Sequence, residues 1–448
     1  MTPYMHLLEM RVQDERVRRD HFRRAWKAYR GEWRVGDPDL PKPLKVDTGS
    51  ADDNVIVAKA RVIVDVSVGL LFGKGVEFQL DATRQTPEED WLKACWEVNR
   101  KASFLMKMGT NGSVCGHAFL RIVPNHFMTR PYPRLINLDP AMLTVLWQDD
   151  DIEQAYEYHV AWNAHNVERG RMEIRRQRIV RFNDVQWLII DEVSEPNAFV
   201  PEWREISRQP WPYAWPPIID CQNLPAPNEY WGEPDLTEDL IDLNNSRNFV
   251  LSNWSRIIKF HASPLTIGKG LNNQEVTVGP NRLVKIPINT DIITEWPQGD
   301  LAGTSDFDRR IDEALHELSG TPAIATGKLE SIGNLSGTAL QVLWKPALDK
   351  TDRKRMTYGD MLIELNRRLL ELGGFGDDKR VTLGWPELLP RNTLEERQAL
   401  QADQDLGVAS KETIAAKLGY DYEVERARIE QEAEAGREFG QALLAGFE

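Results

Sequence analysis

Cysteine is scarce in this sequence of 448 residues, which contains only Cys95, Cys115 and Cys221. Three widely spaced cysteines make neither a disulfide framework nor a zinc site, and they are typical of a protein that works in a reducing compartment. The eight histidines form no HxH or HxxxH pair and stand apart from the cysteines. The sequence therefore gives no support for a metal site, and we expect no cofactor.

Long apolar runs are also missing. The most apolar segment, residues 62–72, is interrupted by Asp65 and followed by Lys74, so it is too short and too polar to cross a bilayer. The first twenty residues carry charges where a signal peptide has its apolar stretch. We expect neither a membrane span nor export by a signal peptide.

Positive charge is in deficit, because 55 Lys and Arg residues face 69 Asp and Glu residues and give a formal net charge of -14. Affinity for nucleic acid comes mostly from Lys and Arg, so this balance argues against tight binding to DNA or RNA. It is compatible with a conduit whose acidic wall repels phosphates and lets a duplex slide past. The content of 41% hydrophobic and 28% charged residues indicates a folded chain, and its length predicts about two to four structural regions.

The first half of the sequence changes from helical to extended patterns. We expect an amphipathic, strongly basic helix over the first thirty residues, then helices over 54–72 and 87–113. Thr86-Pro87 gives the last of these a capping residue followed by a proline suited to the first turn. From 116 to 193, short β-rich segments separated by polar turns predict an antiparallel sheet.

The second half predicts a Pro- and Trp-rich connection, long helices, a small β module and a glycine-rich loop. The best-marked helix pattern starts at Pro234 and carries acidic residues in its first turn. In chain order we expect an extended cover or linker over 194–232, a helix over 234–262, β segments over 265–300, a helix over 305–319, a loop over 321–335, a helix over 336–372 kinked at Pro346, and a charged helical tail from Thr393. The predicted fold class is α+β, mostly helical with a β-rich first half.

Motifs that carry enzymatic chemistry are incomplete. The phosphate-binding loop needs Gly, four residues and Gly-Lys-Ser/Thr, whereas six residues separate Gly320 from Gly327-Lys328, and Leu329 follows the lysine. The sequence also lacks a GxSxG nucleophile elbow. We expect that the protein is not an enzyme.

Charged clusters leave alternatives open. Asp149–Asp151 and Asp191-Glu192 have the carboxylates that a magnesium-dependent nuclease uses, although a solvated hairpin turn explains the first cluster better. The basic run 175–178 lies in a predicted strand. For this run we favour the solvent-facing side of a sheet over phosphate contacts.

Three segments resemble a known family. They are WGEPDLTEDLIDLNNSRNFVLSNWSRI from 231, LSGTPAIATGKLESIGNLSGTALQVLW from 318 and LPRNTLEERQALQADQDLGVASKETIAAKLG from 389. The middle segment has a helix ending in Gly-x-Pro, a loop, and Asn-x-Ser-Gly opening the next long helix. The third has a Leu-Gly step and Ser-Lys-Glu-Thr before an Ala-rich helix. In this order, the segments resemble the portal proteins of tailed double-stranded DNA phages.

The resemblance implies a portal fold with wing, stem, clip and crown regions. By residue number it implies a wing over 1–232 with a helical N-terminus and its β-rich part at 116–193, a stem helix over 233–264, a clip over 265–303, a returning stem helix over 304–320, a tunnel loop over 321–335, a long kinked helix joining wing to crown over 336–389, and a crown over 390–448.

The resemblance also implies roles for single residues. The DNA-facing tunnel loop would present Thr326, Lys328, Glu330, Ser331 and Asn334, the clip would dock motor and adaptor through Lys269, Asn272, Asn273 and Arg282, and the stem helices would carry Asp239, Arg247 and Asp312. Lys328 and Asn334 are the expected phosphate contacts, and Lys269 and Asn273 the expected clip mouth. For each of these four the alternative is an ordinary solvated loop residue.

Function and partners follow from the same resemblance. We expect a ring of twelve subunits at the portal vertex of the virion, assembled in the host cytoplasm, that serves as the channel for genome packaging and ejection. Its expected partners are double-stranded DNA bound without sequence preference, the terminase large subunit, a head–tail adaptor, the major capsid protein and, as a further candidate, the scaffolding protein. A magnesium-dependent nuclease and another head–tail joining protein remain the alternatives.

Overall fold

The computed structural model describes most of the chain. The described residues are 3–33, 37, 54–80, 86–148, 150–167, 170–183, 186–195, 202–261, 265–268, 292–295, 301–326, 337–376, 381–388, 393–418 and 422–430. Only the backbone is described for 3–14, 259–261, 265–268, 292–295, 301–302, 326, 337–340, 393–397, 399 and 416. Two compact units result, unit 1 with Met1–Gly333 and Val342–Pro386, and unit 2 with Asn334–Gln341 and Glu387–Glu448.

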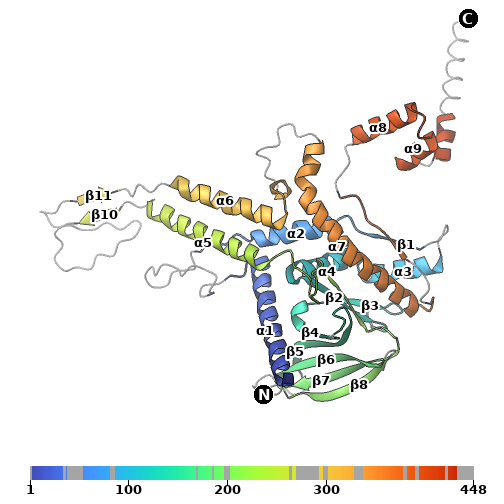
Figure 1. The fold of residues 1–448 in the computed structure, drawn as a ribbon, viewed down its shortest axis with the longest axis horizontal. Coiled ribbons are helices and arrows are strands. Elements are labelled where there is room, and N and C mark those ends of the chain that lie inside the picture. The colour runs from blue at the N-terminus through green and yellow to red at the C-terminus, as the bar shows by residue number, and fades with distance from the viewer. Residues whose placement is uncertain are drawn as a thin grey trace, which may run out of the picture. The chain divides into compact units, whose positions relative to one another are not determined.

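The long helices of unit 1 follow the predicted apolar periodicity, with shifted ends (Figure 1). They are α1 (Pro3–Arg30), α2 (Lys59–Phe72), α3 (Pro87–Val98), α4 (Lys101–Cys115), α5 (Glu238–His261), α6 (Leu301–Ser319) and α7 (Gly337–Leu372), whose first turn belongs to unit 2. Pro346 lies inside α7. The prediction of α2 from residue 54 was wrong, because residues 54–58 are extended.

The predicted single helix over 87–113 was also wrong. Its start is as expected, because the Glu89 N–H donates to Thr86 Oγ1 at 3.4 Å. The helix then stops at Val98, and a new one begins at Lys101. Arg100 between them has a φ of 55°, in the left-handed region that ends a helix. The chain therefore turns here and forms two helices.

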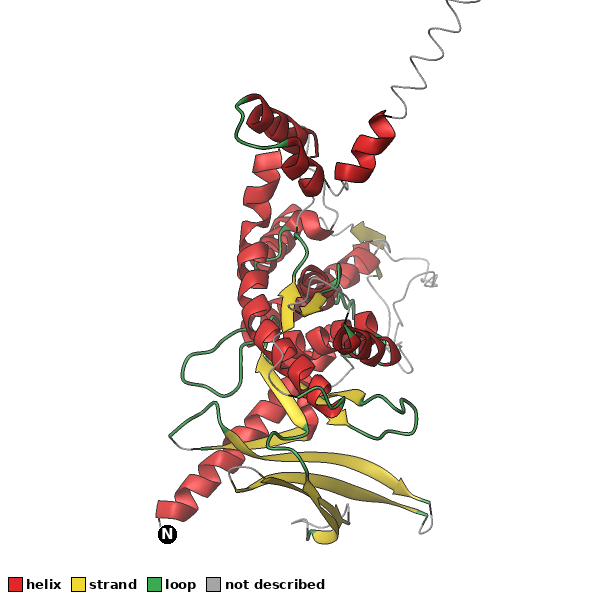
Figure 2. Ribbon diagram, turned by 90° about the vertical axis from the view of Figure 1, so that its right-hand side faces the viewer, coloured by secondary structure: helices red, strands yellow, loops and turns green. Residues whose placement is uncertain are grey.

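Two antiparallel sheets form the β part of unit 1 (Figure 2). The five-stranded sheet follows chain order and contains β4 (Leu143–Trp147), β5 (Ala155–Asn166), β6 (Arg171–Asn183), β7 (Gln186–Ser194) and β8 (Arg204–Trp211). The three-stranded sheet has the order β3 (Arg134–Leu138), β2 (His117–Val123), β9 (Ile218–Gln222). The mixture of helices and sheets agrees with the α+β prediction.

The Pro- and Trp-rich stretch is more regular than expected. The extended cover or linker expected over 194–232 contributes two strands, β8 and β9, to the sheets. Pro210 is tolerated in β8 because this strand lies at the edge of its sheet, where one side needs no ladder hydrogen bond. Residues 135–147 have the sequence pattern of one β segment, but a 3-10 turn, Pro140–Met142, divides them into β3 and β4. The Asp139 carboxylate caps this turn by accepting from the Ala141 N–H.

Two apolar clusters hold unit 1 together. The larger one contains buried residues of α3, α4, α7 and both sheets, among them Phe119, Ile179 and Tyr358. The smaller one lies where α1, α2, α5 and α6 meet, and it includes Leu240 and Leu315. The bases of α5 and α6 are therefore fixed in the core of unit 1.

Short strand pairs and a small helical unit complete the fold. Strand β1 (Glu77–Leu80) pairs with β12 (Val381–Gly384), and between α5 and α6 strand β10 (Leu265–Gly268) pairs with β11 (Ile292–Glu295). Unit 2 contains α8 (Thr393–Asp405), α9 (Lys411–Lys417) and helical residues 422–430. Ser410 caps α9, because its Oγ accepts from the Thr413 N–H at 3.1 Å. The predicted helical tail is confirmed over these residues.

Candidate functional site

Helices α5 and α6 form an antiparallel pair at one side of unit 1 (Figure 1). Near its base, Leu240 and Ile241 of α5 are buried in one cluster with Ile311 and Leu315 of α6. The start of α6 is earlier than the predicted residue 305, and the start of α5 is later than Pro234. Both helices were nevertheless visible in the sequence as apolar stripes.

A charged clamp joins the two helices to α2. The Arg247 guanidinium group donates to both carboxylate oxygens of Asp308, from Nε at 2.8 Å and from Nη2 at 3.2 Å. Its Nη1 donates to the Asp312 carboxylate at 2.8 Å. Asp312 also pairs with Lys59 at the start of α2, at 3.1 Å. The side chain of Asp312 is only 6% exposed. Because guanidinium–carboxylate forks are geometrically specific, the clamp fixes the position of α6 on α5.

Of the three predicted stem residues, the structure brings two together. Arg247 and Asp312 meet in the clamp. Asp239 lies apart, exposed at the start of α5, where its carboxylate accepts from the Leu240 N–H at 3.0 Å and from the Thr237 hydroxyl. This carboxylate thus serves the first turn of the helix, where negative charge is favourable.

A row of polar side chains on α5 binds the extended segment 54–59. Three backbone N–H groups of the segment donate to three side-chain oxygens of the helix. The contacts are Val55 to Ser252 at 2.9 Å, Val57 to Asn248 at 2.9 Å and Lys59 to Asn244 at 3.1 Å. One turn further, Arg256 donates to the Asn54 side chain at 2.9 Å.

Matching spacings explain this row. Residues four apart on a helix are separated by about 6 Å along its axis. Residues two apart on an extended chain are separated by about 6.6 Å. Every second N–H of the segment therefore meets the next turn of α5, and these bonds replace the ones that residues 54–58 would have made in a helix.

We expect Asn248→Ala to reduce the free energy of unfolding by about 1–3 kcal/mol, because it leaves the partly buried Val57 N–H without its acceptor. Asn248 is fully buried, whereas Ser246 on the same helix is exposed. Ser246→Ala is therefore the matched control, with a change within about 0.5 kcal/mol. Urea unfolding measures both, and amide hydrogen exchange should accelerate at Val57 in the first variant alone.

A buried ion cluster fixes the chain just before α5. Asp235 is 1% exposed and pairs with Lys350 at 2.9 Å and, in a shorter contact, with Lys354. Lys354 is fully buried and also donates to Ser67 of α2 at 2.8 Å and to Ser113 of α4 at 3.1 Å. Burial alone would raise the pKa of Asp235, but the two lysine charges hold it well below its usual range.

The close approach of two glycines places the same segment against β2. Gly116 ends α4 with a φ of 80°, and a Cβ at this position would meet the Gly232 carbonyl oxygen at 2.2 Å. Only glycine combines this left-handed backbone with so short a separation. The entry to α5 is therefore set by backbone contact as well as by charge.

The basic N-terminal helix is bound to α5. Arg24 of α1 pairs with Glu238 at 2.6 Å and, more closely, with Asp242. His21 contacts Glu238 at 2.5 Å, and this hydrogen bond is the main cause of the lowered pKa of Glu238. Arg18 lies over the Trp231 ring at 4.2 Å. These charges therefore serve contacts within the subunit.

The predicted loop and clip residues lie outside the described part. These are Lys328, Glu330, Ser331 and Asn334 of the loop and Lys269, Asn272, Asn273 and Arg282 of the clip. Thr326 ends the 3-10 turn Ala323–Thr326, where only its backbone is described. Their roles remain predictions.

The charged clusters weighed as chemistry are accounted for structurally. Asp150 and Asp151 lie in the hairpin between β4 and β5, as predicted. Asp191 lies within β7, where Gln177 and Ser207 each donate to it at 2.7 Å. Within the described ranges, no three His, Cys, Asp or Glu side chains are grouped to hold a metal ion.

The basic run lies in a strand, β6, as predicted, and its arginines pair with acidic residues of the same sheet. Arg176 pairs with Glu192 at 2.5 Å, and Arg178 pairs with Glu157 at 2.7 Å and with Glu192 at 3.4 Å. Arg175 pairs with Glu173 at 2.8 Å. Ion pairs within β6 and to the neighbouring strands explain this run without phosphate.

Sequence reasoning missed the residues that anchor α5. Asn244, Asn248 and Ser252 follow one another at four-residue spacing, which is the signal that could have revealed a polar row along the helix. The pairing of Asp235 with Lys354, 119 residues away, left no such trace. In the described residues, no helix is long and apolar enough to cross a membrane.

Comparison with known proteins identifies the family. A search of the curated proteins finds no match. One similar solved structure is the neck of an empty gene transfer agent (GTA) particle computed with C6 symmetry, with 15% identity and a TM-score of 0.44 over 80% of this chain and 89% of that chain. Another is the virion of a native GTA particle, with 16% identity and a TM-score of 0.41 over 80% of this chain and 89% of that chain. A third is the neck of a native GTA particle computed with C12 symmetry, with 14% identity and a TM-score of 0.41 over 80% of this chain and 88% of that chain.

Those scores are too low to establish a shared fold, so the assignment depends on the sequence match. The family described as phage portal protein, SPP1 Gp6-like, matches residues 13–437. This range contains both sheets, the α5–α6 pair, α7 and the described helices of unit 2. The chain therefore belongs to the SPP1 Gp6-like family of phage portal proteins.

Proposed function

We propose that this protein is a structural subunit of the portal of a tailed phage or phage-like particle, and that its copies form a ring through which double-stranded DNA enters and leaves the capsid. The family match over residues 13–437 is the observation that carries this proposal. The protein would then reside in the virion and act without catalysis of its own. Twelve copies are proposed for the assembled ring, as the resemblance implies.

In this proposal, α5 and α6 are the stem that surrounds the channel. The clamp at Arg247, the polar row on α5 and the buried ion cluster at Asp235 hold one helix pair rigidly on the wing. Rigidity is what a ring of many copies requires, because small errors in each subunit add around the circle. The net charge of -14 supports a channel in which DNA slides rather than binds.

The remaining regions are proposed from chain order. Residues 1–232 would form the wing, 265–303 the clip that docks the terminase large subunit and later the head–tail adaptor, 321–335 the tunnel loop, 336–389 the joining helix and 390–448 the crown. The major capsid protein and a scaffolding protein would contact the outside of the ring. Unit 2 supports a separate last region, because it includes Glu387–Glu448.

Electron microscopy of the purified protein, with native mass spectrometry to count subunits, tests the function. Rings with a central hole and close to twelve copies are expected. A protein that stays monomeric or dimeric at micromolar concentration would contradict the proposal. Cleavage of DNA that disappears with a chelator would instead favour the nuclease.

Shortening the loop between Thr326 and Asn334 tests the channel directly. We expect rings of normal size, because the buried anchors of α5 and α6 lie elsewhere, together with a severe loss of DNA packaging in an assembly assay. A deletion of equal length after residue 430 is the control for chain shortening. Normal packaging by the loop variant would remove the role of this loop.

A further inference from the structure

The turn between β2 and β3 presents two apolar side chains to solvent. Phe127 is 79% exposed and Met128 is 68% exposed. The turn has internal bonds, because the N–H groups of Thr129 and Arg130 donate to the His126 carbonyl at 3.1 and 3.2 Å. The His126 ring also stacks on Phe127 with centroids 4.6 Å apart. An apolar pair held in water by an ordered turn is the mark of a contact surface.

This turn, residues 126–130, also carries a free cation. Arg130 is exposed and has no ion pair with any residue that the structure describes. The turn thus combines a phenyl ring, a thioether and a guanidinium group at one tip. A complementary surface needs an apolar, preferably aromatic, wall with carboxylates at its edge.

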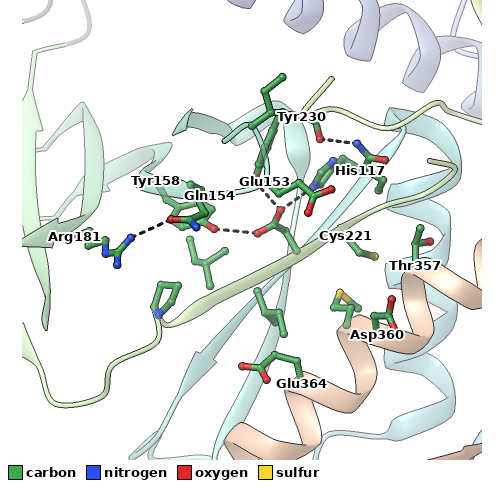
Figure 3. A pocket seen from close by; sticks show the side chains of 18 of the residues that line it. His117, Glu153, Gln154, Tyr158, Arg181, Cys221, Tyr230, Thr357, Asp360 and Glu364 are labelled. Carbon is green, nitrogen blue, oxygen red and sulfur yellow. Dashed lines mark hydrogen bonds and ion pairs between the residues drawn. The ribbon is translucent and has the colours of Figure 1, made fainter. Parts of the chain in front are cut away.

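Unit 1 has such a surface in a cleft of about 690 Å³ between the β4–β5 hairpin, β9 and α7 (Figure 3). Its apolar lining includes Ile152 and Ala155, which are partly exposed, and Tyr158, Trp187 and Tyr230, which are buried. A volume of this size accommodates a small group of side chains. None of residues 124–133 lines the cleft, so the turn does not fill the cleft of its own subunit.

Charge in the cleft is mostly negative. Five carboxylates line it against two guanidinium groups. Both of these are engaged inside the subunit, since Arg368 donates to the carbonyls of Pro216 and Ile218 at 2.9 and 3.0 Å and Arg181 contacts Gln154 at 3.5 Å. The cleft therefore favours an incoming cation.

Three of the carboxylates, Glu153, Glu229 and Asp360, are available for such a cation within the described residues, and two of them lie on the hairpin and on α7, which both border the cleft. Glu153, from the β4–β5 hairpin, and Asp360, on α7, both line the cleft and are exposed. Neither side chain has a hydrogen bond or ion pair within the described residues. Asp220 is different, because Tyr158, Tyr230 and His117 already bond to its carboxylate at 3.1, 2.6 and 2.9 Å. It therefore stiffens the cleft floor rather than receiving a ligand.

We propose that the 126–130 turn of one copy docks into this cleft of the next copy, with Phe127 and Met128 against its apolar lining and Arg130 facing Glu153 and Asp360. Turn and cleft are different surfaces of one subunit, so the contact is head-to-tail. A repeated head-to-tail contact closes into a ring when its rotation allows. The inference thus rests on the proposed ring and names one contact that builds it.

Charge reversal in the assembled protein tests the electrostatic part. Arg130→Glu and Asp360→Arg should each raise the subunit concentration needed for rings by more than about tenfold, because like charges then meet. The double variant should recover most of this loss. Arg204→Glu, at an exposed arginine of β8, is the matched control and should leave assembly unchanged. Single variants that assemble normally, or a double variant without recovery, would overturn the contact.

Photocrosslinking tests the position of the turn. A benzoylphenylalanine replaces Phe127 in rings assembled from equal amounts of 14N- and 15N-labelled protein, and mass spectrometry identifies the products. Mixed-isotope crosslinks to 152–158 or 357–364 are expected. Crosslinks elsewhere, within one copy, or none at all in intact rings would overturn this contact while leaving the ring in place. A wild-type protein without rings would remove the proposed function and the contact together.

Discussion

Asp235→Ala should lower the free energy of unfolding by about 3–5 kcal/mol, the range seen when one partner of a buried ion pair is removed. The carboxylate is 1% exposed and is the acidic partner of both Lys350 and Lys354. Without it, the fully buried Lys354 ammonium retains only the hydroxyls of Ser67 and Ser113. Urea unfolding of the purified variant measures the loss.

Two further variants separate the ion cluster from a general effect. Asp349→Ala removes an exposed carboxylate of α7, the helix that carries Lys350 and Lys354. Asp349 pairs with Lys345 at 2.6 Å, and both side chains are more than half exposed. Its loss should be at most about 1 kcal/mol. Combining Asp235→Leu with Lys354→Met should recover much of the stability, because the fully buried charge is removed and Lys350 keeps its bond to the Ser319 carbonyl at 3.2 Å. An Asp235→Ala protein as stable as wild type would show that the cluster does not hold α5.

The same cluster predicts a dependence on pH. The lysine charges hold the pKa of Asp235 below its ordinary value of 3.8. Because Asp235 is an acid whose pKa is lower in the folded than in the unfolded protein, its carboxylate stabilises the fold fully above pH 3.8. This stabilisation is lost as the pH falls below that value. The difference in unfolding free energy between wild type and Asp235→Asn should therefore shrink as the pH falls below 3.8.

The sequence predicted which segments are helical better than it predicted what the helices contact. The stripes around Leu240 and Leu315 revealed α5 and α6, because burial of one helical face leaves a periodic pattern. Asp235 looked like an acid at a helix start that interacts with the helix dipole. Its role depends on Lys350 and Lys354, and such long-range pairs are set by tertiary packing, which a single sequence does not display.

Local backbone choices account for most of the other differences. Arg100 interrupts a continuous apolar pattern by adopting a left-handed φ, which is uncommon for its residue type. Residues 54–58 stay extended, which suits their β-branched Val and Ile, and the side chains of Ser252 and Asn248 accept from the N–H groups of Val55 and Val57. The apolar pattern alone reveals neither break.

The candidate site could be predicted only as a region. Arg247 stood out because it interrupts an apolar stripe, and the structure explains this by its fork onto Asp308 and its bond to Asp312. The proposed docking turn had no sequence signal, because Phe127 and Met128 read as ordinary apolar residues near a strand. Their exposure of 79% and 68%, a property of the folded turn, is what distinguishes them.

Leu315→Pro should have the other large effect, the loss of the α5–α6 pair and with it of ring assembly. Leu315 is fully buried about one turn before the end of α6, in the cluster that joins this helix to α1, α2 and α5. Proline there removes a backbone hydrogen bond and clashes with the preceding turn, at about 3 kcal/mol or more. Loss of the leucine side chain adds about 2–5 kcal/mol.

Two substitutions at nearby positions isolate the cause. Leu315→Met keeps the volume and the helix, so it should cost less than about 1.5 kcal/mol and leave rings intact. Leu318→Ala changes a side chain that is 58% exposed and should have little effect on the stability of the subunit. Circular dichroism and native mass spectrometry report helix content and ring formation in each variant. Rings of normal size from Leu315→Pro would mean that copies assemble without α6, and the stem would then have to be sought in another pair of helices.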